Sequence, residues 1–234
     1  MIDKLLEILQ YNPKEPMIFS SGIFLFLFLG FTFVYMLLRK KLTARLAFVT
    51  AFSYYFYYKS SGLYFLLLAI VTVSDFILAM VIERGRGKTS ARWMLALSMV
   101  IDIGFLLYFK YTNFFVGMIA NAIGSNFQPW DIFLPVGISF FTFQSMSYTI
   151  DVYRGKIKPL SSLLDYAFYV SFFPQLVAGP IVRYDQIEAE LRVRHESLPQ
   201  FMEGAKRFAI GLGKKVILAN AMASIADPIF DAAV

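Results

Sequence analysis

The feature that most constrains this 234-residue chain is a run of 22 residues, Met17 to Leu38, that contains no charged side chain. At a rise of 1.5 Å per residue, a helix of this length is about 33 Å long and can cross the ~30 Å hydrocarbon layer of a membrane. Only 16% of all residues are charged, whereas soluble domains carry about 25%. The sequence therefore predicts an integral membrane protein. We expect an all-α fold, because helices satisfy their own backbone hydrogen bonds in lipid.

Further apolar segments follow this run, and they predict a polytopic transmembrane helical bundle that forms one membrane domain over residues 1–234. The additional spans are expected at residues 46–58, 63–82, 93–109 and 132–150, with 111–130 exterior. Lys and Arg cluster in the connecting segments 39–45, 84–92 and 154–158. By the positive-inside rule these segments are cytoplasmic, which places the N-terminus outside. A short interfacial helix is expected around residues 5–9.

Residues 166–182 form an apolar stretch that does not read as an ordinary membrane helix. The segment 172–183, FFPQLVAGPIVR, contains two prolines and a glycine and ends on Arg183. These residues break the helical hydrogen-bond ladder, and broken backbone cannot face lipid. A full crossing would also place the basic residues that follow on the unfavoured side. We therefore expect a re-entrant element buried in protein or beside a water-filled cavity; a kinked spanning helix is the alternative.

A polar stripe marks the predicted helix around residues 134–155. Gln144, Ser147, Tyr148 and Asp151 are three, four and seven residues apart and so share one helix face. Such a stripe faces either a partner helix or a water-filled path, and both interpretations stay open. Under the second, the candidate residues of the path are Gln144, Ser147, Tyr148, Asp151, Gln175 and Pro180.

Two carboxylates, Asp75 and Asp102, fall near the middle of predicted spans, where a charge is costly. Each either pairs with a Tyr or Arg of a neighbouring helix or lies on a proton or acyl-acceptor pathway. The single histidine, His195, lies in a charged segment, which favours a solvated surface side chain. Cysteine is absent. We therefore predict no metal site.

Residues beyond 196 predict an amphipathic helix. Ser197 and Gln200 have the spacing of a capping box. Apolar residues then recur at intervals of three and four up to Ala219. This helix is expected at the cytoplasmic face of the membrane or against the bundle.

Three motifs in order carry a resemblance to a known family: LPVGISFFTFQSMSYTIDVYRG (134–155), FFPQLVAGPIVRYDQ (172–186) and GLGKKVILANAMA (211–223). The chain resembles the membrane-bound O-acyltransferases, in the branch that includes the alginate O-acetylation membrane protein and the D-alanyl transfer protein of teichoic acid modification. The resemblance implies helices that enclose a tunnel in the bacterial inner membrane. It also implies no bound cofactor and transfer of an acyl group from a cytoplasmic thioester, such as acetyl-CoA or an acyl carrier, to a polysaccharide hydroxyl. An exterior acetyl-transfer partner protein is implied as well.

The sequence also departs from the family. The family's catalytic histidine belongs to a motif of the type FWRRWH, which is absent here, and His195 does not match it. We therefore expect the N-terminal portion of the family's domain, inactive alone. The donor side would use the basic residues Arg154, Lys156, Lys158 and Arg183. The alternatives are a transporter or channel and a non-catalytic scaffold. Nucleic acid is not an expected partner, because the basic residues lie between apolar runs.

Overall fold

The fold is helical throughout the part of the chain that the structure describes. The structure is a computed structural model that describes residues 9–13, 15–177, 180–192 and 197–232, and no β-strand occurs in these ranges. This confirms the predicted all-α membrane bundle. Two compact units divide the chain: Met1–Pro16 with Val34–Glu188, and Met17–Phe33 with Ala189–Val234. Most of the predicted N-terminal helix, and His195, lie outside the described residues.

The first apolar helix is shorter than the sequence predicts. Helix α2 (Gly22–Leu37) has 16 residues rather than 22. It starts late because the chain turns before it: the Ser21 N–H donates to Ile18 O, and Ser21 Oγ accepts from the Phe24 N–H at 3.2 Å. At 1.5 Å per residue the helix is about 24 Å long, so α2 is shorter than a hydrocarbon layer.

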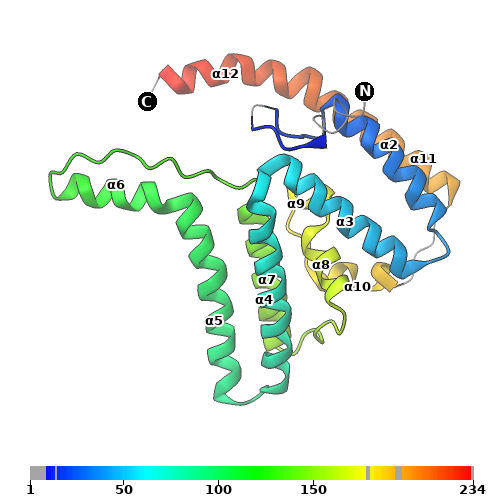
Figure 1. The fold of residues 1–234 in the computed structure, drawn as a ribbon, viewed down its shortest axis with the longest axis horizontal. Helices are drawn as coiled ribbons and strands as arrows, with labels where there is room; N and C mark the ends of the chain where they lie inside the picture. The colour runs from blue at the N-terminus through cyan, green and yellow to red at the C-terminus, as the bar shows by residue number, and fades with distance from the viewer. Residues whose placement is uncertain (1–8, 14, 178–179, 193–196, 233–234) are drawn as a thin grey trace. The chain divides into compact units, whose positions relative to one another are not determined.

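The next helices form two long apolar stretches, Leu42–Arg84 and Thr89–Ala122, each long and apolar enough to cross a membrane. They consist of α3 (Leu42–Ser61), a 3-10 turn η1 (Gly62–Tyr64), α4 (Phe65–Arg84), α5 (Thr89–Leu106), a π-helical turn η2 (Leu107–Tyr111) and α6 (Thr112–Ala122). The chain bends at Gly62, whose φ is +61°. Figure 1 shows that α6 leaves α5 at a wide angle, with η2 at the bend.

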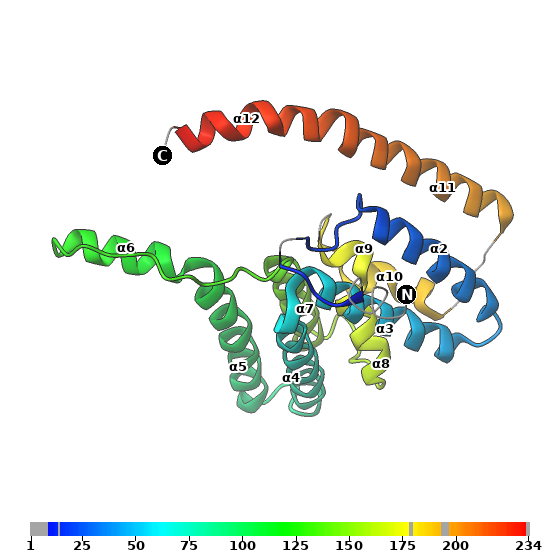
Figure 2. The same cartoon turned by 45° about the horizontal axis from the view of Figure 1, so that its top comes forward.

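The core of the larger unit is a group of three helices, α4, α5 and α7 (Ile138–Tyr153), which contact one another (Figures 1 and 2). Helix α3 packs against α8 (Leu163–Ser171) and α9 (Phe173–Leu176), and α8 also contacts α4. Helix α10 (Tyr184–Arg192) follows. Helix α7 begins six residues later than predicted, because Gly137 adopts a left-handed conformation with φ +75° at its N-cap.

The second unit contains α11 (Leu198–Gly213), a π-helical turn η3 (Lys214–Ala219) and α12 (Asn220–Ala232). The predicted capping box is confirmed, since Ser197 and Gln200 each bond the other's backbone N–H. Within this unit the rings of Phe28 and Phe208 stack at 5.5 Å. The segment Leu198–Phe230 is also long and apolar enough to cross a membrane. Its location at the membrane surface therefore stays a prediction.

Candidate functional site

The segment with two prolines is broken at Phe172, and the backbone at this break is paired and buried. The helix stops at Phe172, where φ −52° and ψ 107° leave the helical region, and α9 starts at the next residue. The Phe173 N–H that the break releases donates to Ser53 Oγ of α3 at 3.2 Å. Both Ser53 and Phe173 are buried. One continuous helix through residues 166–182 is therefore excluded, while re-entry into the membrane stays a prediction.

The far end of this segment lies against the start of α7. A Cβ atom on Gly137 would be 2.2 Å from the Leu176 carbonyl oxygen, so the two backbones touch there. Gln175 is partly buried, and its Nε2 has no hydrogen-bond partner among the described residues. Pro180 is exposed, and the two residues before it lie outside the described ranges. Of the two candidate path residues in this segment, Gln175 and Pro180, Gln175 is the one whose side chain has an unused N–H donor.

The polar stripe of α7 faces neighbouring protein. Gln144 is buried and donates from Nε2 to the Tyr169 carbonyl of α8 at 2.7 Å. Tyr148 is buried and its hydroxyl accepts from the Leu160 N–H at 2.7 Å. Ser147 is partly buried and donates to the Gln144 carbonyl at 2.8 Å. The contacts of Gln144 and Tyr148 join α7 to the segment that follows it, as the partner-helix interpretation expects, whereas the contact of Ser147 lies within α7.

Four buried tyrosines surround the stripe, and sequence reasoning identified only one of them. The ring of Tyr148 lies 4.7 Å from Tyr166, 6.1 Å from Tyr169 and 5.7 Å from Tyr184. The Tyr169 hydroxyl donates to the Val182 carbonyl at 3.1 Å, across the break at Phe172. The cluster therefore connects α7, α8 and α10. The spacing of Tyr166 and Tyr169 by three residues is a sequence signal that could have indicated a shared face.

Basic residues gather at the C-terminal end of α7. Lys156 forms an ion pair with Asp185 of α10 and lies 4.0 Å from Asp151. The hydrogen bond from Lys156 holds the pKa of Asp185 below its usual value, and Arg183 adds to the effect. The structure thus brings Lys156 to Asp185, and Arg183 lies two residues before that carboxylate in the chain. Arg154 and Lys158 are exposed at the same end of the helix.

A further arginine contacts this end of α7, and the sequence analysis did not predict that contact. Arg86, between α4 and α5, donates to the Val152 carbonyl at 3.0 Å and forms an ion pair with Glu83. Its guanidinium lies over Gly155, whose φ of +73° turns the chain. A cation at a helix C-terminus complements the helix dipole. The contact confirms that the basic segments 84–92 and 154–158 lie at the same end of the bundle.

The two intramembrane carboxylates are fully buried. Asp75 of α4 accepts from Ser98 Oγ of α5 at 2.8 Å, and Asp102 lies four residues after Ser98 on α5, where neither of its carboxyl oxygens has a hydrogen-bond partner among the described residues. Ser98 also contacts Thr149 of α7 at 3.4 Å. Asp75 therefore pairs with Ser98 rather than with the expected Tyr or Arg. No group of three or more potential metal ligands occurs in the part of the chain that the structure describes.

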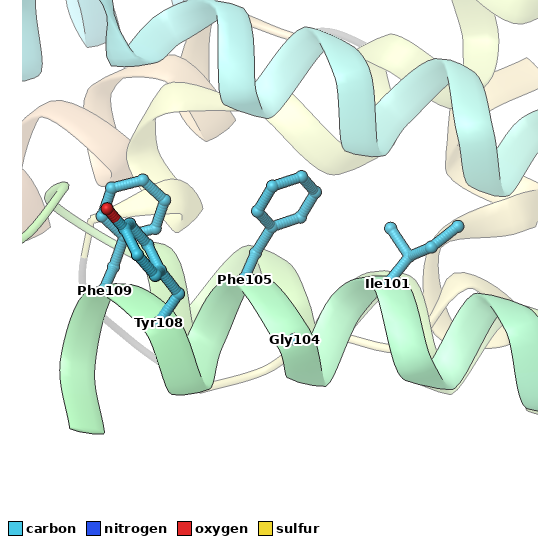
Figure 3. Close-up of a pocket in the computed structure, with 5 residues that line it drawn as sticks. All are labelled: Ile101, Gly104, Phe105, Tyr108 and Phe109. Atoms are coloured by element: carbon cyan, nitrogen blue, oxygen red, sulfur yellow. The ribbon is translucent and has the colours of Figure 1, made fainter. Parts of the chain in front are cut away.

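A shallow groove on α5 and η2 does not belong to this polar site. It is lined by Ile101, Gly104, Phe105, Tyr108 and Phe109. Figure 3 shows Ile101, Phe105 and Phe109 on one side of the helix, and Gly104 leaves the space between their turns open. Because this lining is almost wholly apolar, the groove suits a hydrocarbon chain rather than a polar reactant.

Comparison with known proteins gives curated relatives over nearly the whole chain. It is 39% identical over 221 residues to a probable alginate O-acetylase, AlgI, of Pseudomonas aeruginosa, and 39% over 222 residues to the protein of the same name from Azotobacter vinelandii. It is also 31% identical over 249 residues to a peptidoglycan O-acetyltransferase of Helicobacter pylori. The chain is thus similar, over nearly its whole length, to proteins named for O-acetylation of alginate and of peptidoglycan. The resemblance of the three sequence motifs is thereby confirmed.

The matches cover 92%, 92% and 93% of this chain and 42%, 44% and 47% of the relatives, so the chain spans less than half of their length. No family model and no solved structure matches the chain. The relatives are named for O-acetyl transfer, and the helices that are long and apolar enough to span a membrane identify this chain as a membrane protein.

Proposed function

We propose that the chain forms part of a bacterial inner-membrane O-acetyltransferase that acetylates an exported or cell-surface polysaccharide similar to alginate. The observation that carries the proposal is the 39% identity, over 92% of the chain, to a protein named as a probable alginate O-acetylase. The donor would be acetyl-CoA or an acyl-carrier thioester, and an exterior acetyl-transfer protein would complete the reaction. The basic segments would be cytoplasmic and the N-terminus exterior.

The geometry suggests a role for each part of the site. Arg154, Lys158 and Arg183 would attract the anionic donor, while Lys156 holds α10 in place through Asp185. Gln144 and Tyr148 would fix the broken segment beside α7, so that the donor amide of Gln175 lies at a constant position along the path. A buried hydrogen-bonded network of this kind holds backbone that could not face lipid.

The chain also lacks the arginine- and tryptophan-rich histidine motif that the family resemblance implies for catalysis. General acid–base catalysis needs a group with an accessible proton near the reacting hydroxyl, and histidine is the usual one. We therefore propose that these residues alone bind and position reactants but do not transfer the acetyl group.

A chimera tests the proposal. This chain replaces the aligned segment of the Pseudomonas aeruginosa relative in a strain that lacks its own alginate O-acetylase, and acetyl esters are measured on the secreted alginate and on peptidoglycan. We expect acetylated alginate from the chimera and none from the chain alone. A chimera that reaches the membrane at the parental level but yields no acetylated polymer would contradict the proposal. Acetyl esters confined to peptidoglycan would contradict the assigned substrate.

A matched pair of variants tests the role of the polar stripe. Gln144→Leu keeps the side-chain volume but removes the donor to Tyr169, whereas Phe143→Leu changes an exposed neighbour on the same helix. We expect Gln144→Leu to lower acetylation by about tenfold or more, corresponding to ~1.4 kcal/mol for a buried hydrogen bond, and Phe143→Leu to have little effect. Equal activities would remove the stripe from the proposed path.

Solute transport is the second candidate, because Asp75 and Asp102 are buried carboxylates inside predicted spans. Uptake of labelled solute into liposomes that depends on Asp75 would favour it. Acetyl transfer by the chimera without such uptake would favour the transferase.

A further inference from the structure

Several buried hydrogen-bonding groups flank the point where the broken segment meets α3. The two elements meet at the hydrogen bond from the Phe173 N–H to Ser53 Oγ. We call the contact between residues 50–57 of α3 and residues 171–175 the α3 seam. Four side-chain atoms of the seam are shielded from solvent and have no hydrogen-bond partner among the described residues: Thr50 Oγ1, Tyr57 Oη, Ser171 Oγ and Gln175 Nε2.

The hydroxyls of Thr50 and Ser171 differ from other buried hydroxyls of the same unit. Ser53 donates to the carbonyl four residues before it at 2.8 Å, and Thr72 of α4 does the same at 2.7 Å. A serine or threonine inside a helix commonly bonds its own helix in this way. Thr50 and Ser171 are buried and make no such bond. Their hydroxyls are therefore left for a partner outside their own helices.

The Tyr57 hydroxyl is unpaired in the same part of the fold. Tyr57 is fully buried, and its ring lies edge-on to Phe141 of α7 at 6.3 Å. The nearby Ser61 Oγ accepts from the Val136 N–H at 3.1 Å, and it does not meet the Tyr57 hydroxyl in hydrogen-bonding geometry. Burying a hydroxyl without a hydrogen-bond partner is costly. A partner for this group would remove that cost.

We propose that the α3 seam is a binding site for buried water molecules, which hydrogen-bond Thr50, Tyr57, Ser171 and Gln175. Buried water typically bonds polar groups that the protein itself leaves unpaired. The seam offers three hydroxyls, which can donate or accept, and one amide N–H, which donates. Water can serve both kinds of group because it donates and accepts.

The packing around the break favours a ligand as small as water. The ring of Phe173 lies 5.2 Å from Phe52 and 5.7 Å from Phe56. At the other end of α9 the backbones of Leu176 and Gly137 touch. Close packing at both ends of this short helix suits single water molecules better than a sugar ring or an acyl chain.

Bound water would also explain how a membrane protein tolerates the break. Non-helical backbone at membrane depth is stable only inside protein or beside water. At the α3 seam both conditions would hold, since Ser53 pairs the released Phe173 N–H and water would pair the side chains around it. The site does not depend on acetyl transfer, because it rests on hydrogen bonding within the larger unit alone.

Radiolytic footprinting of the chain in lipid nanodiscs tests the site. An X-ray pulse converts bound water into hydroxyl radicals, which oxidise the side chains beside it, and mass spectrometry locates the products. We expect Tyr57 to be oxidised several times faster than Tyr148, which is also buried but whose hydroxyl is bonded to the Leu160 N–H. The double variant Thr50→Val with Ser171→Ala removes two hydroxyls of the site and should abolish this excess.

Unfolding in SDS gives a second measurement, because a hydrated seam and a dry seam predict opposite signs. If water occupies the site, Tyr57→Phe removes a hydrogen bond and should lower the unfolding midpoint. If the hydroxyl is unpaired, the same variant removes a desolvation cost and should raise the midpoint. Tyr148→Phe is the control, since it loses a bond to protein and should lower the midpoint in either case.

Three results would overturn the proposal: oxidation of Tyr57 no faster than that of Tyr148, a raised midpoint in Tyr57→Phe, or an excess oxidation that survives in the double variant. The first comparison is made within the parent chain, so it decides the question even where a variant does not fold. Failure of the chimera to acetylate alginate would contradict the proposed function and leave these outcomes unchanged.

Discussion

Replacing Gly137 with alanine should be among the most destabilising single-methyl changes in the larger unit. Gly137 has φ +75°, where an L-residue with a Cβ costs about 1–2 kcal/mol. Its added Cβ would also lie 2.2 Å from the Leu176 carbonyl oxygen, while real contacts of this kind stay above 3.0 Å. Overpacking against backbone adds about 1–3 kcal/mol. We therefore expect Gly137→Ala to lower the free energy of unfolding by about 2–5 kcal/mol.

Alanine variants at two other glycines separate the conformational part of this cost from the overpacking part. Gly87 has φ +79° with no atom near its missing Cβ, so Gly87→Ala should cost only the conformational part, about 1–2 kcal/mol. Gly104 lies inside α5 with open space beside it, so Gly104→Ala should stabilise the helix by about 0.5–1 kcal/mol. All three variants add the same methyl group, so differences in stability among them reflect the backbone conformation of each glycine and the space beside it.

Unfolding of the detergent-solubilised chain by SDS, followed by far-UV circular dichroism, measures the series. We expect the order Gly104→Ala most stable, then the parent chain, Gly87→Ala and Gly137→Ala. If Gly137→Ala were no worse than Gly87→Ala, the close contact between the start of α7 and α9 would be refuted. The broken segment would then be held beside the polar stripe by the hydrogen bond from Gln144 to Tyr169 and not by this contact.

The remaining predictions concern a buried hydroxyl, an ion pair and the basic end of α7. Tyr148→Phe removes the acceptor of the Leu160 N–H and should cost about 1–3 kcal/mol in the same unfolding assay, while Tyr108→Phe, at an exposed site, should cost almost nothing. Because the pKa of Asp185 is lower in the folded chain, its stabilisation is present above the ordinary value of about 3.9 and is lost as the pH falls through the folded value. The difference in unfolding midpoint between the parent and Asp185→Asn should therefore shrink on acidification below about pH 4, and a constant difference would contradict the ion pair. Changing both Arg154 and Arg183 to Ala in the chimera should raise the donor concentration needed for half-maximal acetylation about fivefold, at ~0.5 kcal/mol for each exposed charge. Arg207→Ala is the control, since Arg207 is paired with Glu203, and an unchanged donor requirement in the double variant would exclude the basic end as the donor site.

Much of the helical arrangement could be predicted because it depends on local sequence. Long uncharged segments predict spans, prolines predict the break near Phe172, and Ser197 with Gln200 predicts a helix start. The boundaries of α2 and α7 were wrong by five and six residues. Their starts depend on the Ser21 turn and on the left-handed Gly137, which a hydropathy pattern does not reveal.

The contacts of the candidate site were less predictable, because they join residues that are far apart in the sequence. The Ser53 hydroxyl meets the Phe173 N–H across 120 residues, and Ser98 meets Asp75 across 23. A single sequence shows that Asp75 needs a partner but not which helix supplies it. The stripe on α7 was found because its residues share one helix, whereas the tyrosines that cover it come from α8 and α10 as well.

The contact between Arg86 and the end of α7 has a consequence for the order of events during synthesis. Arg86 leaves the ribosome 66 residues before Val152, whose carbonyl it will bind. At about 5–20 residues per second, roughly 3–13 s separate the two. During that interval the positive charges of the α4–α5 loop are expected to hold it on the cytoplasmic side, as the positive-inside rule predicts, while the guanidinium has no helix end to cap. We therefore expect the same side chain to act first as a topological signal and later, through its hydrogen bond to Val152, as the cap of the C-terminal end of α7. Arg86→Lys should keep the positive charge of the loop and weaken the hydrogen bond to the Val152 carbonyl.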